Sequence, residues 1–351
     1  MNIKSLLIGS AAALVAFSGA QAADAIVAAE PEAVEYVKVC DAFGTGYFYI
    51  PGTETCLKIA GLVRVQADFG KDVDGQSDFN TWALARVNFT AKNDTELGAL
   101  TSFIEFEGGA DEYDGVGISP NGAGNGVSLR QAYIDIAGVR AGWFYSWWDD
   151  DLSGDTDALS SHSKFAAVQY TYTGESFSAG LSVEELEHGK AGSYSTTAGA
   201  TTYTPGVVDG YDVGVTGMLS GAFGPVKATL LASYDIDAEE YAVRGIATAA
   251  IGPGTLGFAA AYASGTNQYY AVSEWTVAAE YAFKATDKLT ITPGAQYFGD
   301  VGFKAPDAYQ VGLTLDYAVT AGLAAKAQVT YYDEDKADGV TTGYLRIQRD
   351  F

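Results

Sequence analysis

The sequence predicts an all-β fold, a transmembrane antiparallel β-barrel of about 16 strands over residues 57–351. Three observations predict it. Apolar and polar side chains alternate with a period of two from Leu57 onward, in segments of about 9–12 residues, the length of a tilted strand that crosses a bilayer. Short turns and long polar loops alternate along the chain. The apolar faces often end in Tyr, Trp or Phe.

The segment that begins at Leu57 shows the alternation most plainly. Its apolar face consists of Ile59, Gly61, Val63, Val65, Ala67 and Phe69, and its polar face of Lys58, Ala60, Arg64, Gln66 and Asp68. Alternation alone does not separate a membrane barrel from a soluble β-sandwich. The segment lengths, the rhythm of the loops and the terminal aromatic residues together favour the barrel. A barrel of this size encloses an aqueous lumen rather than packed side chains.

The connections between segments support this architecture. Short turns are predicted at residues 93–96, 221–224, 252–254, 284–287 and 320–322, and long polar loops at 108–127, 149–164, 185–210 and 264–273. Short periplasmic turns and longer outer loops are typical of outer-membrane barrels. The weakest segment is 128–146, where alternation is imperfect and the facing of Arg130 stays open. A strand buried on both sides, as at a subunit interface, is one explanation.

The N-terminus reads as an export signal. Residues 1–22 combine a basic start, a short apolar stretch and an Ala20-Gln21-Ala22 cleavage site, so we expect a signal peptide that is cut after Ala22. Beyond it, the best candidate for an apolar helix, residues 245–263, is interrupted by Gly252-Pro253-Gly254. Helical membrane spans are therefore not expected, whereas a closed barrel can satisfy every backbone group inside a membrane.

Residues 23–56 are expected to form a periplasmic N-terminal segment that contains both cysteines, Cys40 and Cys56. An exported chain meets an oxidising compartment, so a disulfide is the default interpretation. The short loop that it closes implies a stabilisation of about 3 kcal/mol. A metal site is a poor alternative, because the two histidines of the chain, His162 and His188, are far away in sequence.

Composition excludes some classes of function. A formal net charge of −24 argues against nucleic-acid binding, which needs a basic surface. Disorder is excluded as well, because 48% of the residues are hydrophobic. The 23 tyrosines suit the aromatic belts that barrels place at membrane interfaces.

Several stretches resemble a known family. Residues 37–58, with both cysteines, resemble the N-terminal signature of alphaproteobacterial general porins, and so does Arg140-Ala141-Gly142-Trp143, which leads into an acidic loop. The signal peptide and the C-terminal ending are similar too, and the resemblance covers the whole chain. A terminal Phe351 is typical of outer-membrane barrels as an assembly signal. Arg349 departs from the pattern, because an apolar residue is usual there.

The resemblance implies a location in the outer membrane of a Gram-negative, alphaproteobacterial cell, and a homotrimer of 16-stranded barrels. Each barrel would be a passive channel for small hydrophilic solutes and ions, narrowed by the third extracellular loop, which folds inward. Expected partners are outer-membrane lipids, lipopolysaccharide and the barrel-assembly machinery. No cofactor is expected. Alternatives are a substrate-specific channel for a sugar or an oligoanion, or a barrel that acts as an adhesin or structural protein.

Charged residues predict a pore constriction, because selectivity in such channels comes from charge at the narrowest point. The acidic run 146–157 matches the in-folded loop by position and by family likeness. Basic residues of the predicted strands face inward in the expected register. The predicted constriction residues are Asp149, Asp150, Asp151, Asp155 and Asp157 on the loop, and Lys58, Arg64, Arg86, Arg140 and Arg346 on the wall. We expect a transverse electric field between the two groups.

Two other interpretations of this loop are weak. Five of its residues match a calcium-binding loop, but Ser160 stands where a bidentate Glu is needed, so no metal site is predicted. His162 lies near Ser160, Ser161 and Asp157, the residue types of a catalytic triad. Neighbouring residues on one loop rarely give triad geometry, and a G-x-S-x-G elbow is missing, so an enzyme is not expected.

Overall fold

A computed structural model describes residues 37–71, 78–111, 127–189, 193–197, 200–204 and 208–351. The chain divides into two compact units, Met1–Lys38 and Val39–Phe351, and every element below belongs to the second. The predicted signal peptide, residues 1–22, lies outside the described residues. The strands are β1 (Phe48–Tyr49), β2 (Cys56–Gly70), β3 (Phe79–Thr95), β4 (Gly98–Asp111), β5 (Val127–Ile136), β6 (Val139–Tyr145), β7 (Lys164–Thr173), β8 (Phe177–Gly189), β9 (Ser193–Thr197), β10 (Ala200–Thr204), β11 (Val208–Phe223), β12 (Val226–Asp235), β13 (Glu240–Ile251), β14 (Gly254–Ala263), β15 (Ser273–Lys284), β16 (Leu289–Val301), β17 (Ala308–Thr320), β18 (Leu323–Glu334) and β19 (Val340–Asp350).

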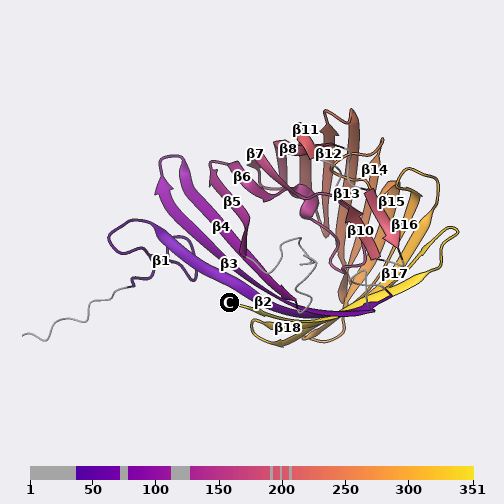
Figure 1. Cartoon of the computed structure of the whole chain (residues 1–351). Coiled ribbons are helices and arrows are strands. Elements are labelled where there is room, and N and C mark those ends of the chain that lie inside the picture. The colour runs from indigo at the N-terminus through magenta and orange to yellow at the C-terminus, as the bar shows by residue number, and fades with distance from the viewer. Residues whose placement is uncertain (1–36, 72–77, 112–126, 190–192, 198–199, 205–207) are drawn as a thin grey trace, which may run out of the picture. The chain divides into compact units, whose positions relative to one another are not determined.

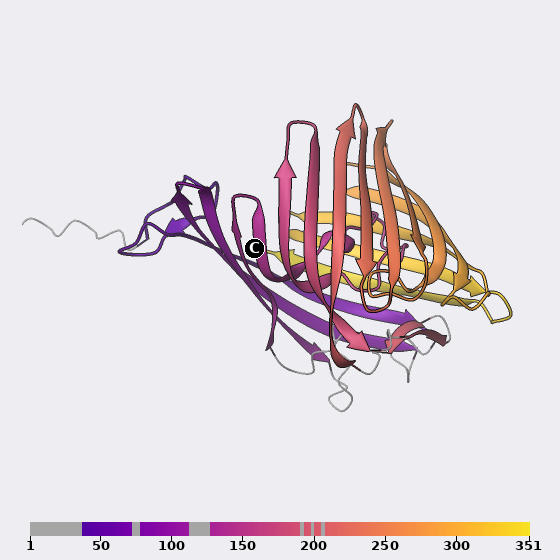
Figure 2. The same cartoon turned by 90° about the horizontal axis from the view of Figure 1, so that it is seen from above.

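The strands close into a barrel. β2–β8 and β11–β19 form a 16-strand antiparallel β-barrel, as the sequence predicts. β8 pairs with β11, while β9 and β10 form a separate hairpin between them. β19 returns to β2, with Thr342 opposite Gly70 and Asp350 opposite Leu62, and this pairing completes the ring. Figures 1 and 2 show the C-terminal strands beside the N-terminal ones. Closure leaves these strands without unpaired edges.

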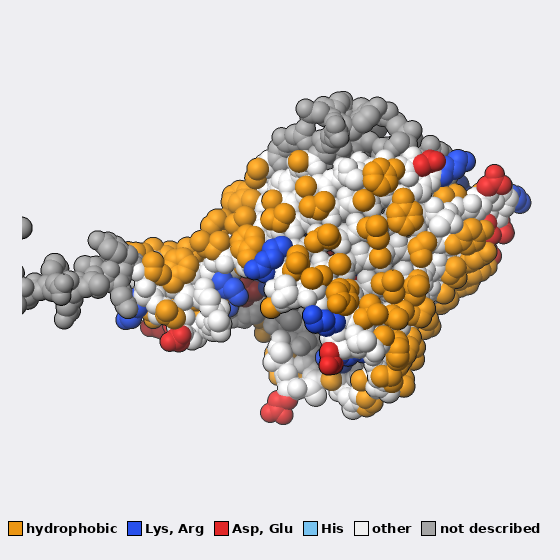
Figure 3. All heavy atoms as spheres, turned by 90° about the horizontal axis from the view of Figure 1, so that it is seen from below, with side chains coloured by type: hydrophobic (Ala, Val, Ile, Leu, Met, Phe, Trp, Pro, Cys, Tyr) orange, Lys and Arg blue, Asp and Glu red, His pale blue; other side chains and the backbone are white. Residues whose placement is uncertain are grey.

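The outer face of the barrel is apolar. On β2, Ile59, Val63, Val65 and Phe69 are exposed, whereas Gln66 of the opposite face is buried. Figure 3 shows hydrophobic side chains spread over the outer surface in view. The predicted two faces of this strand are therefore confirmed. Among the described residues, no helix is long and apolar enough to cross a membrane.

Aromatic residues mark the two ends of the barrel wall. At the end that carries the long loops, exposed rings lie on successive strands: Tyr234, Tyr241, Tyr262, Trp275, Tyr297, Tyr309 and Tyr331. Neighbouring rings contact one another, as between Trp275 and Tyr297, whose centroids are 5.4 Å apart. At the end that carries the short turns, Tyr172 and Phe177 have centroids 5.7 Å apart. Such girdles lie at the interfaces of a bilayer.

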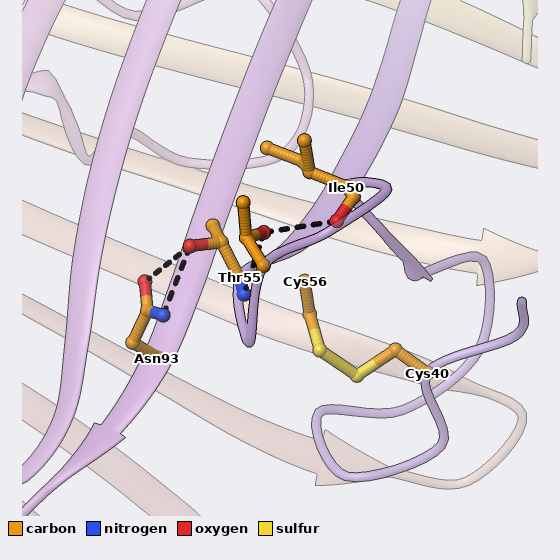
Figure 4. The surroundings of a disulfide bond; sticks show 6 residues. Cys40, Ile50, Thr55, Cys56 and Asn93 are labelled. Carbon is orange, nitrogen blue, oxygen red and sulfur yellow. Dashed lines mark hydrogen bonds between the residues drawn. A yellow bond between two sulfur atoms is a disulfide. The ribbon is translucent and has the colours of Figure 1, made fainter.

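The N-terminal segment is anchored by the disulfide. Cys40 and Cys56 are bonded, which confirms the predicted pair (Figure 4). Both cysteines are buried against Tyr47, and β1 pairs with the start of β2. Thr55 Oγ1 is also 2.9 Å from Asn93 Nδ2, which donates to it from β3. The segment is thereby fixed to the turn end of the barrel.

The imperfect alternation of the segment 128–146 has a local cause. Strand β4 pairs with β5 through Glu105 opposite Gln131, and then Phe106 opposite Leu129, so Arg130 is an extra residue in a β-bulge. A bulge places two successive residues opposite one and interrupts the period of two. The irregular pattern therefore does not require a strand buried on both sides. Arg130 turns toward the carboxylates of Glu105 and Glu107, which settles its facing.

The C-terminus joins the ring at its turn end. Phe351 and Gly61 exchange two backbone hydrogen bonds of 2.9 and 3.0 Å, so the last residue extends the β19–β2 ladder. Arg349, the residue that departs from the family pattern, donates from Nη1 to the carbonyl oxygen of Gly322, 2.9 Å away in the turn between β17 and β18. A long basic side chain can thus leave an apolar surface for the polar end of the barrel.

Candidate functional site

The site is built around residues 146–163, which connect β6 to β7 and are called the inner loop below. Its two ends meet where Ser146 N donates to Ser163 O at 2.7 Å. The loop begins with the short 3₁₀ helix η2 (Trp147–Asp149), which Ser146 caps by accepting a hydrogen bond from Trp148 N. Figure 1 shows this segment within the ring of strands.

Arg244 of β13 holds the start of the inner loop. Its guanidinium donates to the carbonyl oxygens of Trp147 at 2.7 Å and Trp148 at 2.9 Å. The Trp148 ring is fully buried, lies 4.8 Å from the guanidinium carbon and donates from Nε1 to Ser233 Oγ at 2.8 Å. A buried guanidinium needs such acceptors, because an unpaired charge inside a protein is costly. The first turn of the loop is therefore fixed to β12 and β13.

Polar side chains of β15 and β16 hold the middle of the loop. Ser153 N donates to Glu280 Oε1 at 2.8 Å. Gln296 forms a double hydrogen bond with the backbone of Ala158: it accepts from the amide at 2.7 Å and donates to the carbonyl oxygen at 3.0 Å. Both wall residues are buried. The loop thus pairs with side chains of the barrel wall where it has no strand partner.

The tip of the loop reaches β17, β18 and β19. Thr314 donates to Gly154 O, and Gln310 donates to Thr156 O. Asp155 accepts a hydrogen bond from Tyr344 and lies 3.3 Å from Lys326 Nζ and 3.8 Å from Arg346 Nη1. The inner loop therefore contacts the barrel wall from β12 round to β19.

The five predicted loop carboxylates have different surroundings. Asp149 accepts from Ser163 Oγ at 2.8 Å, Asp155 meets the cations of β18 and β19, and Asp151 lies 3.7 Å from Arg244. Burial and the nearby Asp157 together raise the pKa of Asp151 to about 7. Burial likewise raises the pKa of Asp157 to about 6 and that of Asp150 above its usual range. Part of the loop's charge therefore titrates near neutrality.

Two of the predicted wall bases lie side by side across the β2–β19 seam. Arg64 stands opposite Gln348 and donates to it at 2.8 Å, while Arg346 stands opposite Gln66 and donates to its amide oxygen. Amide partners leave the guanidinium charge in place. Arg346 also meets the loop through Asp155, so the seam brings a wall base and a predicted loop acid together.

Arg86 belongs to a second cluster, which the sequence did not predict. Its Nη2 lies 2.6 Å from Glu107, which also lies 2.5 Å from Arg130 Nη1. Glu105 lies 3.5 Å from Arg130 and 3.9 Å from Arg86. These four residues, Arg86, Glu105, Glu107 and Arg130, are called the quartet below. Its two positive and two negative charges balance within the wall.

The structure does not bring the other two predicted bases to the loop. Lys58 lies 5.9 Å from the ring centroid of Tyr47, beside the disulfide. Arg140 forms an ion pair of 3.0 Å with Asp135 next to a short turn, and its guanidinium carbon is 4.3 Å from the Tyr133 ring centroid. Both residues have the inward facing that alternation predicts, but they lie toward the turn end of the barrel.

Several residues of the site were missed by sequence reasoning: Glu105, Glu107, Arg244, Glu280 and Lys326. Lys326 and Glu280 do fall on the polar faces of alternating segments, so a search restricted to inward-facing charges could have found them. Within the described ranges, no group of three or more His, Cys, Asp or Glu residues could hold a metal ion. Two carboxylates of the partial calcium-loop pattern accept hydrogen bonds from the inner loop itself, Asp157 from Leu152 N and Asp149 from Ser163 Oγ.

Comparison with known proteins agrees with this architecture. The family model described as the porin subfamily matches residues 24–348. The chain is 46% identical to outer membrane protein IIIA of Rhizobium leguminosarum bv. viciae, over 98% of this chain and 93% of that protein. It is 38% identical to porin Omp2b of Brucella neotomae, over the full length of both.

Among solved structures, the trimer form of OmpT, an outer membrane protein of Vibrio cholerae, superposes with a TM-score of 0.60 at 12% identity, covering 85% of this chain and 100% of that one. This likeness shows the fold alone. The family match and the close relatives establish more than the fold. The chain belongs to the porin subfamily.

Proposed function

We propose that the protein is an outer-membrane porin, a passive aqueous channel through which small hydrophilic solutes and ions diffuse. The observation that supports this best is the inner loop itself. It contacts the inner wall from β12 to β19 and carries exposed carboxylates, whereas the outer face of the barrel is apolar. A pore of this kind discriminates by the width and charge of its narrowest part rather than by chemistry on the solute.

The charge pattern favours cations weakly. The acids near the inner loop and the facing wall are Asp149, Asp150, Asp151, Asp155, Asp157, Glu105, Glu107, Glu280 and Asp316, and the bases are Arg64, Arg86, Arg130, Arg244, Arg346 and Lys326. The acids outnumber the bases even when the raised pKa values of Asp151 and Asp157 are considered. A net negative lumen raises the local concentration of cations.

The mechanism follows from where these charges lie. Carboxylates of the inner loop and the guanidinium group of Arg64 form a transverse field across the water-filled passage, beside the direct contact of Arg346 with Asp155. A polar solute can orient its dipole along the field, whereas an apolar solute must displace favourable water contacts. The low-dielectric wall of the barrel concentrates this field, because few mobile dipoles screen it.

The orientation and assembly belong to the same proposal. The short turns and the disulfide-bonded segment face the periplasm, and the long loops face outward, where they contact lipopolysaccharide. Three copies assemble as a homotrimer, by analogy with the trimer form of OmpT. Phe351 serves as the signal that the barrel-assembly machinery reads, and its position at the last rung of the closing β19–β2 ladder suits that role.

Planar bilayer recording tests the proposal. We expect the natively purified protein to insert in conductance steps grouped in threes. Under a KCl gradient, the sign of the reversal potential should indicate a weak preference for K⁺. A folded and inserted barrel that does not conduct would refute a diffusion channel.

One observation favours a second candidate, a channel specific for an oligoanion. Arg64, Arg346 and Lys326 lie on three adjoining strands, β2, β19 and β18, and could bind a chain of anionic groups in succession. A small oligoanion added to the KCl recording distinguishes the two. Block at micromolar concentration supports the specific channel, and unchanged conductance supports general diffusion.

A further inference from the structure

The loop between β14 and β15, residues 264–272, is not the exposed polar loop that its composition predicts. Asn267, Gln268, Tyr269 and Tyr270 are all buried, and both tyrosines have no exposed surface. The loop supports its own bend, because Asn267 Oδ1 accepts from the amides of Tyr269 at 2.9 Å and Tyr270 at 3.0 Å. A long loop that folds inward and orders itself in this way requires an explanation other than connection.

This loop is hydrogen-bonded to the returning end of the inner loop. Ser161 N donates to Tyr269 O at 2.9 Å, and Ala271 N donates to Ser161 Oγ at 2.7 Å. One bond joins two backbone groups, and the other joins a backbone amide to the Ser161 hydroxyl. The inner loop is thus held at both ends, by Arg244 where it starts and by residues 269–271 where it returns.

The side chain of Tyr269 fills a prepared position. Its ring lies between Trp148 and Phe165, with centroid distances of 5.8 and 5.7 Å. Its hydroxyl donates to Glu184 Oε2 at 2.7 Å, and burial raises the pKa of that hydroxyl far above its usual range, so it stays a donor. A Cβ at Gly214 would lie 1.9 Å from the hydroxyl oxygen, so this position of β11 requires glycine.

The hydrogen bonds continue from Tyr269 back to the inner loop. Glu184 Oε2 also accepts from Thr216 Oγ1 at 2.8 Å, and Thr216 Oγ1 lies 2.8 Å from Ser233 Oγ. Ser233 accepts from Trp148 Nε1, which returns the network to the first turn of the inner loop. Tyr269 therefore contacts the inner loop twice, through ring packing and through this buried chain of donors and acceptors.

We propose that residues 264–272 are a latch that holds the inner loop in the lumen, with Tyr269 as its positioning residue. The inference rests on the proposed channel function. The tip of the inner loop is held by hydrogen bonds from Thr314 and Gln310 and by the ion pairs of Asp155, which face the lumen and are weakened by water and salt. The latch contacts are buried. Loss of a buried hydrogen bond costs more free energy than loss of an exposed one, because it leaves an unpaired polar group away from water. The latch therefore adds to the wall contacts that keep the inner loop in place, and it secures the returning end of the loop.

Single-channel recording of Tyr269→Ala tests the latch. We expect the mean conductance to change less than its fluctuations do. Excursions to other conductance levels should be about tenfold more frequent, as expected from the loss of one buried interaction. Tyr269→Phe keeps the ring and loses the hydroxyl, so the frequency of its excursions should lie between that of Tyr269→Ala and that of the wild type. Tyr262→Ala, which removes an exposed ring of β14, is the matched control and should leave the excursions unchanged.

A reversible cross-link provides the second measurement. Ser161→Cys with Ala271→Cys joins the inner loop to the latch where they already touch. Oxidation should suppress the excursions of Tyr269→Ala, and reductant should restore them, with Tyr269→Ala alone treated identically as a control for the native disulfide. Steady current through a conducting Tyr269→Ala channel would overturn the latch. Loss of conductance in the wild type would instead refute the channel function on which the latch rests.

Discussion

The carboxylate of Asp155, at the tip of the inner loop, lies 3.3 Å from the ammonium nitrogen of Lys326 on β18. Lys326 is shared, because Asp316 of β17 lies 3.3 Å away on its other side. The contact with Asp155 joins residues 171 positions apart in the chain. The contact brings the inner loop to β18, beside the seam between β19 and β2. It determines where the negative charge of Asp155 meets the positive charges of Lys326 and Arg346.

Neutralising Asp155 should make the channel less selective for cations. Asp155→Asn removes one negative charge and leaves Lys326 and Arg346 without this partner. A single charge several ångströms from a passing ion in water contributes roughly 0.5–1 kcal/mol, so the permeability ratio should shift by about two- to fivefold toward anions. The reversal potential in a KCl gradient measures this. Asp287→Asn, which changes a fully exposed turn residue, should leave it unchanged; equal shifts in both variants would disprove a special role for Asp155.

Removing the shared carboxylate of the quartet should destabilise the barrel. Glu107→Gln leaves Arg86 and Arg130, now 2.6 and 2.5 Å from a neutral amide, without their main counter-charge. Loss of one partner of a buried ion pair typically costs about 3 kcal/mol. The free energy of unfolding, from urea titration of the protein in lipid vesicles, should fall accordingly.

Two further variants separate charge balance from other effects of that substitution. Glu107→Gln combined with Arg130→Gln restores neutrality and should recover part of the lost stability. Glu96→Gln alters an exposed turn residue and should leave the free energy of unfolding unchanged. A double variant less stable than Glu107→Gln alone would show that the carboxylate acts through its hydrogen bonds rather than its charge.

The sequence predicts which face a residue takes better than how high it lies in the barrel. Alternation is a local property, and it correctly turns Arg64, Arg86 and Arg346 inward. The height depends on the register between strands that are distant in sequence. Lys58 and Arg140 therefore face inward as expected but lie toward the turn end, beside Tyr47 and Asp135.

Local irregularities limited the prediction in two other places. The bulge at Arg130 shifts the period by one residue, and only the pairing of Glu105 with Gln131 reveals it. Residues 264–272 look like an exposed loop because Ser, Gly, Asn and Gln are common in loops. Residues 267–271 are nevertheless buried, because their polar groups find partners within the loop, on the inner loop and on the wall, as Asn267 and Tyr269 show. Polarity alone does not distinguish a solvated group from a paired one.

A larger side chain at Gly312 should narrow the channel. A Cβ at this position of β17 would lie 2.7 Å from Thr156 Oγ1. Gly312→Val therefore has to displace the tip of the inner loop from the wall. Because the tip packs against the inner face of β17, its displacement away from the wall moves it into the passage. The single-channel conductance should fall by roughly 1.5- to 2-fold, because the narrowest section limits the current.

The partner residue provides the test of this cause. Thr156→Gly in the Gly312→Val background removes the clash with the inner loop, although not the close approach to Thr330 Oγ1, and should return the conductance toward that of the wild type. Gly245→Val is a matched control, because a Cβ at Gly245 meets nothing within 4 Å. A conductance that stays unchanged or rises in Gly312→Val would contradict a movement of the tip into the passage.

Acidification should reduce the cation preference in two steps. Burial raises the pKa of Asp151 to about 7 and that of Asp157 to about 6, so both carboxylates are ionised at pH 8 and both are protonated at pH 5. Each protonation removes one negative charge from the inner loop. The reversal potential, measured in a KCl gradient from pH 8 to pH 4, should therefore move toward anion preference through pH 7 and again through pH 6, well above the region where exposed aspartates titrate. Asp151→Asn should abolish the upper step and keep the lower one, whereas Asp287→Asn should keep both. A reversal potential that stays constant from pH 8 to pH 5 would show that neither carboxylate influences the ions that pass.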